Sequence, residues 1–170
     1  MPAGLKQTSS VVSIGFSATE TGPNTFTQTS VDLNLSPLDR EVFVVLAVNI
    51  DPFPSDAITA TDTLVAASLT TTSQTGVTNL SNSNCLANAI NSIQAAGFTD
   101  GGVSFQTGAI ETPPATLEYI GIIATNDFFV QVAGLNNNSP KGVTGKMYGY
   151  RARADADIFS ALVQSEVLSS

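Results

Sequence analysis

The stretch from residue 115 to 154 constrains the fold more than any other, because it carries the pattern of three consecutive β-strands. β-Branched and aromatic residues are concentrated over 117–123, which is typical of a buried strand. Residues 125–127 tolerate turn geometry, and apolar residues resume over 128–132. This order predicts a β-hairpin that forms the frame of the protein.

A third strand is predicted over 143–153, after a loop at 134–140 whose Gly, Asn and Pro residues cannot extend a ladder. Alternate residues of a strand share a face. Lys146, Tyr148 and Tyr150 are therefore expected on one face of this strand. Together, the three strands predict an antiparallel β core.

The first third of the chain repeats this pattern. Apolar residues alternate from residue 10 and again over 25–35, with turn residues at 21–24 between them, so a second hairpin is expected. Every residue over 42–48 is apolar, which predicts a strand covered on both faces within the segment 41–51.

Two helices are expected. Apolar residues recur at helical spacing over 84–96, after the N-cap candidates Ser83 and Asn84 and before Gly97, which is placed to end a helix. A short C-terminal helix is expected at about 156–168, where acidic residues fall in the first turn.

These elements predict a mainly β protein: a single antiparallel β-sandwich or jelly roll of about eight strands, with one inserted helix at about 84–96 and a short C-terminal helix at about 156–168. Another strand is expected at 103–110. Residues 10–170 are expected to form this single domain. Residues 1–9 are expected to form an extended N-terminal arm that is ordered only on a neighbouring molecule.

The surface of this domain is expected to carry few charges. Only 12% of the residues are charged, so Ser, Thr, Asn, Gln and Gly must supply most exposed polar groups. Few charges then need desolvation when two molecules meet, which favours extensive subunit contact. The alternative is the neutral polar coat of a secreted protein. A formal net charge of −8 argues against neutralising a nucleic acid over the whole surface.

Residues typical of catalysis are scarce. The chain has no histidine, which is the commonest general base and a frequent metal ligand. Its single cysteine, Cys85, is expected to be a small buried residue and not a nucleophile, since no histidine is available to pair with it. We therefore expect no enzyme activity and no cofactor.

The chain also shows no membrane signal. Its first residues lack the apolar core of a signal peptide, and no run approaches the roughly 18 apolar residues of a membrane span. We expect synthesis in the cytosol and no membrane contact.

Two groups of carboxylates are candidate sites. Glu111 and Glu118 flank a strand entry and are interpreted as solvated strand ends. Asp51, Asp56 and Asp62 gather in one proline-bounded loop region, where their oxygens are weak candidates for a Ca²⁺ site. Ordinary turn chemistry is the alternative for these three aspartates.

The basic residues are unevenly distributed, because Lys141, Lys146, Arg151 and Arg153 are four of the six in the chain. One interpretation is a set of salt bridges to acidic residues of the same chain. The other is that Arg151 and Arg153, on one face of a strand, meet an acidic patch on a neighbouring subunit or contact nucleic acid weakly. The candidate subunit-contact residues are Lys6, Tyr148, Tyr150, Arg151 and Arg153.

The segment 117–130 (LEYIGIIATNDFFV) and the segment 148–155 (YGYRARAD) resemble those of jelly-roll structural proteins of marine phages and viruses. The resemblance covers the last third of the chain. It implies a shell built by repeated side-to-side packing, in which an N-terminal arm can lock neighbours. The chain differs from RNA-virus examples in lacking a basic arm, which argues against direct genome condensation.

The leading hypothesis is a non-enzymatic virion structural protein, either a capsid subunit or a capsid-decorating protein, that forms a symmetric homo-oligomer. Its partners would be copies of itself and other virion proteins, and it would be located in the virion after synthesis in the host cytoplasm. One alternative is a carbohydrate- or surface-binding β-sandwich, with Tyr148 and Tyr150 as a stacking platform and Ca²⁺ in the 51–62 loop. Another is a tail-tube or filament subunit.

Overall fold

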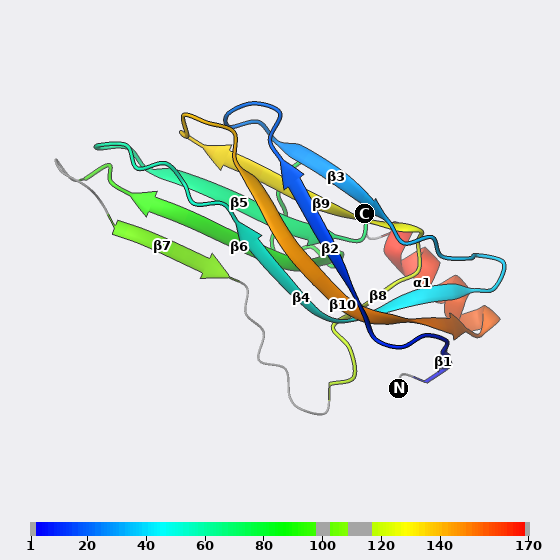
Figure 1. Cartoon of the computed structure of the whole chain (residues 1–170). Coiled ribbons are helices and arrows are strands. Elements are labelled where there is room, and N and C mark those ends of the chain that lie inside the picture. The colour runs from blue at the N-terminus through cyan, green and yellow to red at the C-terminus, as the bar shows by residue number, and fades with distance from the viewer. Residues whose placement is uncertain (1–2, 98–102, 109–116, 169–170) are drawn as a thin grey trace.

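A computed structural model describes residues 3–97, 103–108 and 117–168, which form two antiparallel sheets packed face to face and one helix (Figure 1). Sheet I contains β1 (Leu5–Gln7), β2 (Val12–Thr19), β4 (Glu41–Pro52), β8 (Gly121–Ile123) and β10 (Gly142–Ala154). Sheet II contains β3 (Thr27–Asp32), β5 (Thr63–Thr70), β6 (Cys85–Gln94), β7 (Val103–Gly108) and β9 (Asp127–Leu135). The helix, α1 (Ala156–Leu168), follows β10 directly and confirms the predicted C-terminal helix.

The strand order identifies the kind of sandwich. Without β1 and β7, sheet I has the order β2-β10-β4-β8 and sheet II has the order β3-β9-β5-β6. Strands β2 and β3 lie in opposite sheets, as do β4 and β5, and β9 and β10. This is the double Greek-key connectivity of a jelly roll, so the predicted fold class is confirmed.

Both predicted hairpins are wrong, because the paired segments lie in different sheets. Strand β8 pairs with β4, whereas β9 pairs with β3 and β5. Likewise, β2 pairs with β10 and β3 pairs with β9. Ile123 of β8 and Phe128 of β9 enter the same core from opposite sheets. Turn residues therefore marked where the chain reverses, and burial across the sandwich determined the partners.

The predicted inserted helix at 84–96 is also wrong, because β6 occupies this segment and pairs with β5 and β7. Its apolar residues fit two periods at once, and Ala87 and Ala89 alternate into the buried face. Asn88, Asn91 and Ser92 are weak helix formers. Hydrogen bonding on both edges of β6 therefore outweighs a marginal local helix preference.

The main core lies between the sheets. Phe16 of β2 and Phe128 of β9 meet edge to face in it, with ring centroids 6.0 Å apart and ring planes at 81°. Phe43 and Val45 of β4 also point into this core.

A second cluster covers the opposite face of sheet I, where Phe159, Leu162 and Val163 of α1 pack over Val42 and Val44. All four residues from Val42 to Val45 are fully buried, so the predicted two-sided burial of this strand is confirmed for its first half. The helix α1 covers only one end of the outer face of sheet I. The second half of β4 therefore has a partly exposed face.

A β-bulge interrupts the pairing of β4 with β10. The register shifts between Tyr148 and Gly149, so that Leu46 is an extra residue on β4. A Cβ atom at Gly149 would collide with the Val44 carbonyl oxygen and the Phe43 ring. Glycine is therefore required at this close approach of the two backbones.

The predicted N-terminal arm supplies β1, which pairs with the end of β10 in its own chain. Leu5 is buried there, and Asp155 donates its backbone N–H to the Gly4 carbonyl at 3.1 Å. The first described residues thus lie against the junction of β10 and α1 of their own chain. Among the described residues, no helix has the length and apolar character needed to cross a membrane.

Candidate functional site

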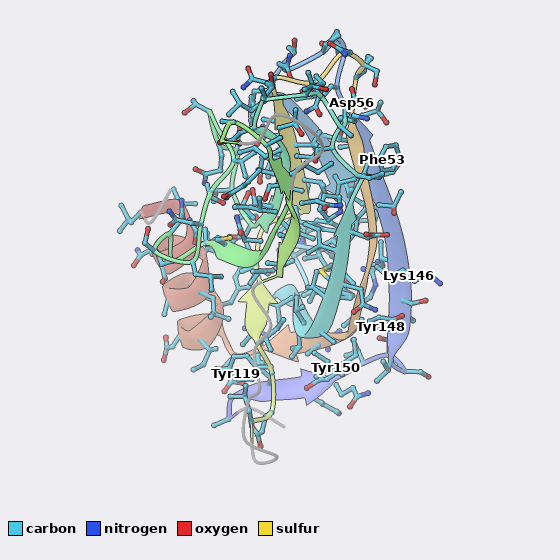
Figure 2. All side chains as sticks on the ribbon, turned by 90° about the vertical axis from the view of Figure 1, so that its left-hand side faces the viewer. Phe53, Asp56, Tyr119, Lys146, Tyr148 and Tyr150 are labelled. Carbon is cyan, nitrogen blue, oxygen red and sulfur yellow. The ribbon has the colours of Figure 1, made fainter. Side chains whose placement is uncertain are left out.

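The two ends of the sandwich carry different chemistry. Figure 2 shows Phe53 and Asp56 at one end and Tyr119 and Tyr150 at the other, with Lys146 and Tyr148 between them. We call the first the loop end, since the β2–β3, β4–β5 and β9–β10 connections meet there, and the second the helix end, where β1, α1 and the β3–β4 loop meet (Figure 1).

The basic hollow lies at the helix end and has a volume of about 320 Å³. Its lining includes Lys6 of β1, Arg40 of the β3–β4 loop, and Arg153 and Asp155 at the end of β10. Three of the six cationic side chains in a chain of net charge −8 thus lie around one hollow. Such a concentration of positive charge attracts acidic groups.

Strand pairing brings two of these cations together. Lys6 lies directly opposite Arg153 in the β1–β10 ladder, while the neighbouring pair, Leu5 and Ala154, is buried. Alternation therefore places Lys6 and Arg153 on the same outward face. Like charges in directly opposite positions destabilise a sheet, so this pair does not favour folding.

The third cation is held by an unusual backbone. Arg40 has a φ of +53°, a left-handed conformation that is uncommon for a residue other than glycine. Its N–H donates to the Pro37 carbonyl at 3.1 Å, and its carbonyl accepts the Ala154 N–H at 3.0 Å. The end of β10 therefore fixes Arg40 at the rim of the basic hollow.

The counter-charges of the hollow are weak. Arg153 forms an ion pair with Asp39 at 4.0 Å, and the two side chains are 56% and 61% exposed. An exposed pair of this kind contributes little to stability. Asp155 adds a carboxylate to the lining, and the Arg153 side chain remains more than half exposed to another molecule.

An apolar groove lies on the other side of the same loop and also has a volume of about 320 Å³. Phe159 and Val163 of α1 form one wall, and Leu35 and Pro37 form the other. Glu41 also lines it, and Ala124, Thr125 and Asn126, which follow β8, close it. The groove is thus built from three segments that are distant in sequence.

Leu38 projects between the basic hollow and the apolar groove. Its side chain is 95% exposed, the largest exposure among the large apolar residues described. Figure 1 shows the β3–β4 loop that carries it projecting beside α1. We call residues 36–40, together with the hollow and the groove, the contact region.

The predicted contact residues have different roles in the structure. The Arg151 guanidinium donates to the Leu33 carbonyl at 2.5 Å, to the Asn34 carbonyl at 3.2 Å and to Glu41 Oε1 at 2.5 Å. These bonds fix the β3–β4 loop to β10, as the salt-bridge interpretation predicted. Arg153, two residues later on the same face, lines the basic hollow.

The two tyrosines do not form an exposed stacking platform. Tyr150 is only 7% exposed and belongs to the cluster beneath α1, where burial raises the pKa of its phenol and the nearby Glu118 adds to the shift. Tyr148 is half-buried, and Lys146 is exposed on the outer face of sheet I (Figure 2).

The three calcium candidates have separate surroundings. Asp56 accepts Lys141 Nζ at 2.7 Å and the Asn138 N–H at 2.8 Å, and the lysine contact lowers the pKa of Asp56. Asp62 accepts the N–H groups of residues 95 and 96 through one oxygen, whereas Asp51 is exposed on β4. In the described part of the chain, no three metal-ligating side chains gather. Glu111 lies outside the described residues.

The sequence interpretation missed a polar network at the loop end. Glu20 is buried and accepts the N–H groups of Gly134 at 3.0 Å and Lys141 at 2.8 Å. Asn137, 4% exposed, accepts the Asp56 N–H and donates to the Leu64 carbonyl, both at 2.9 Å. The turn residues at 21–24 and the Asn-rich loop at 134–140 were the available signal, but they did not identify these partners.

A buried carboxylate, Glu166, fastens the end of α1. It is 6% exposed and accepts the Ala124 N–H at 2.9 Å and the Thr125 hydroxyl. Burial raises the pKa of Glu166 despite these donors. Cys85 lines a small cavity of about 190 Å³ with Glu166, is half-buried, and donates its thiol to the Ala87 carbonyl at 3.3 Å.

Comparison with protein-family models, with curated proteins and with solved structures gives no match for this chain. The fold defines it as a jelly-roll β-sandwich with a C-terminal helix. Its function has to be inferred from the surface that this fold presents, since a jelly roll hosts several unrelated functions.

Proposed function

We propose that this protein is a non-enzymatic virion structural protein, a capsid subunit or a capsid-decorating protein, that acts by symmetric self-assembly. The observation that carries the proposal is the contact region, in which a fully exposed leucine separates an apolar groove from a basic hollow. Groups of this kind are complementary to a protein surface, and the acidic exterior of a second copy is one such surface.

The fold supports the same proposal by analogy. Jelly rolls occur in viral capsid domains, and also in lectins and cupins. A sandwich with few charges loses little free energy by desolvation when it packs side to side. Apolar contact then contributes about 25 cal/mol per Å², summed over interfaces that typically bury about 1,200–2,000 Å² in total.

Electron microscopy and native mass spectrometry of the purified full chain test this proposal. Closed particles, rings or caps at micromolar concentration are the expected products. Open rods would favour the tail-tube or filament alternative, because a helical contact does not close. A protein that stays strictly monomeric would contradict self-assembly, and glycan binding by that monomer would favour the carbohydrate-binding alternative.

A further inference from the structure

Leu38 has the properties of an anchor for another molecule. Exposing a leucine almost completely is unfavourable in water, and this side chain makes no contribution to either described core cluster. Its loop is held in place, since Glu41 donates its N–H to the Ser36 carbonyl at 3.0 Å and Ala154 donates to Arg40. The leucine is therefore presented on a rigid support, which reduces the entropy lost on docking.

The apolar groove offers a matching receptor. Its walls include the apolar residues Leu35, Pro37, Phe159 and Val163, and its volume is about 320 Å³. Glu41 also lines it, with its carboxylate bonded to Arg151. Pro37 lines the groove and Leu38 is the next residue, so the anchor and the receptor lie side by side. Leu38 points out of the protein and does not fill the groove of its own chain.

We propose that Leu38 of each molecule docks into the apolar groove of a second copy, forming a reciprocal two-fold contact. A two-fold interface uses the same patch on both subunits, so anchor and receptor must both lie within that patch. This inference rests on the proposed function, and it names the contact through which copies of the chain assemble.

The charges beside Leu38 favour the same partner. Asp39 and Arg40 follow it in sequence, and both are exposed together with Arg153. In a reciprocal contact the two loops face one another, so the loosely held Asp39–Arg153 pairs of the two copies, 4.0 Å apart in each, lie together and Asp39 can pair with Arg153 of the other copy. Opposite charges thus surround the apolar contact and favour this register over a shifted one.

Sedimentation velocity of full-length variants tests the docking. Leu38→Asp is expected to weaken association on the order of 100-fold, because a charge replaces a central apolar anchor. Leu80→Asp is the matched control, since Leu80 is also an exposed loop leucine, 54% exposed, outside the contact region. It should associate as the unmodified protein does. Circular dichroism melting should show all three proteins equally folded.

A mixing experiment then identifies the receptor. Val163→Phe fills the groove but keeps Leu38, whereas Leu38→Asp keeps the groove. Neither variant should associate alone, and their mixture should form a heterodimer through the one remaining anchor and groove. Absence of a heterodimer when both variants are folded would overturn the pairing of Leu38 with the groove.

The outcomes separate this inference from the proposed function. Assembly of the unmodified protein that Leu38→Asp leaves unchanged would overturn the docking and leave self-assembly in place. Loss of association with Leu80→Asp but not with Leu38→Asp would also overturn it. An unmodified protein that is monomeric at every concentration would overturn both.

Discussion

One charged pair at the loop end and one at the helix end of the sandwich differ in how closely and how deeply they are held. At the loop end, Lys141 and Asp56 lie 2.7 Å apart with side chains only 12% and 26% exposed. At the helix end, Arg153 and Asp39 lie 4.0 Å apart, and both are more than half exposed. The loop end is therefore completed by its own chain, whereas the helix end leaves charge and apolar surface for another molecule.

The largest effect is expected from Asn137→Ala at the loop end. This change removes the partners of the Asp56 N–H and the Leu64 carbonyl in a buried site. We expect the free energy of unfolding to fall by about 3 kcal/mol, since each buried group left unpaired costs about 1–3 kcal/mol. Urea denaturation measures it. The adjacent, exposed Asn138→Ala is the control, and an equal loss there would contradict the role of Asn137.

Arg151→Lys and Arg153→Lys form a matched pair at the helix end. Lysine cannot reproduce the fork that joins Arg151 to Leu33, Asn34 and Glu41, so this change should lower the free energy of unfolding by about 1–2 kcal/mol. The same change at Arg153 should alter it by less than about 0.5 kcal/mol. Equal losses of stability in thermal melting would contradict the different structural roles given to the two arginines.

The pH dependence of stability should carry a contribution from Glu166. Its pKa is raised above the model-compound value of 4.5, so the folded state binds a proton more tightly than the unfolded state. This contribution is fully present below about pH 4.5 and is lost as the pH rises through the raised pKa. Glu166→Gln should remove that loss, which denaturation midpoints across the pH range will reveal. A parallel pH profile in both proteins would contradict it.

Asp56 should contribute to the pH dependence of stability in the opposite direction. Its pKa is lowered from 3.8, chiefly by the hydrogen bond from Lys141, so its contribution is present above about pH 3.8. It is lost as the pH falls through the lowered pKa. Asp56→Asn should flatten the acid side of the stability profile, with Asp51→Asn, on an exposed strand position, as its control. An unchanged acid limb would exclude a stabilising Lys141 contact.

The residues explain which parts of the fold were predictable. The predicted strands at 41–51 and 143–153 were confirmed. The order of apolar residues in each strand matches the faces that are buried in the structure. The segment 84–96 was misassigned, since its apolar spacing is compatible with a helix and with a strand. The pairing partners of the strands were less predictable than the strands themselves. A turn sequence shows that the chain reverses, but it does not show which sheet the next strand joins.

The contact region shows the same limit. Arg153 was a candidate contact residue by sequence, but Arg40 and Leu38 were not. Arg40 stands out by its left-handed backbone, and Leu38 by its position beside a groove made of distant segments, and neither feature can be read from the sequence. Gln131 illustrates the converse case. It lies within an apolar run and is fully buried, where it bonds Ser68 at 2.7 Å and Thr70 at 2.8 Å. Neither pairing is encoded in local spacing.

Amide hydrogen exchange of the unmodified protein at increasing concentration tests the difference between the two ends most directly. We predict that association slows exchange over residues 36–41 and 152–157 at the helix end, and leaves exchange over 20–24 and 134–141 at the loop end unchanged. Protection that first grows at the loop end, or that does not change at either end while the protein assembles, would contradict the account.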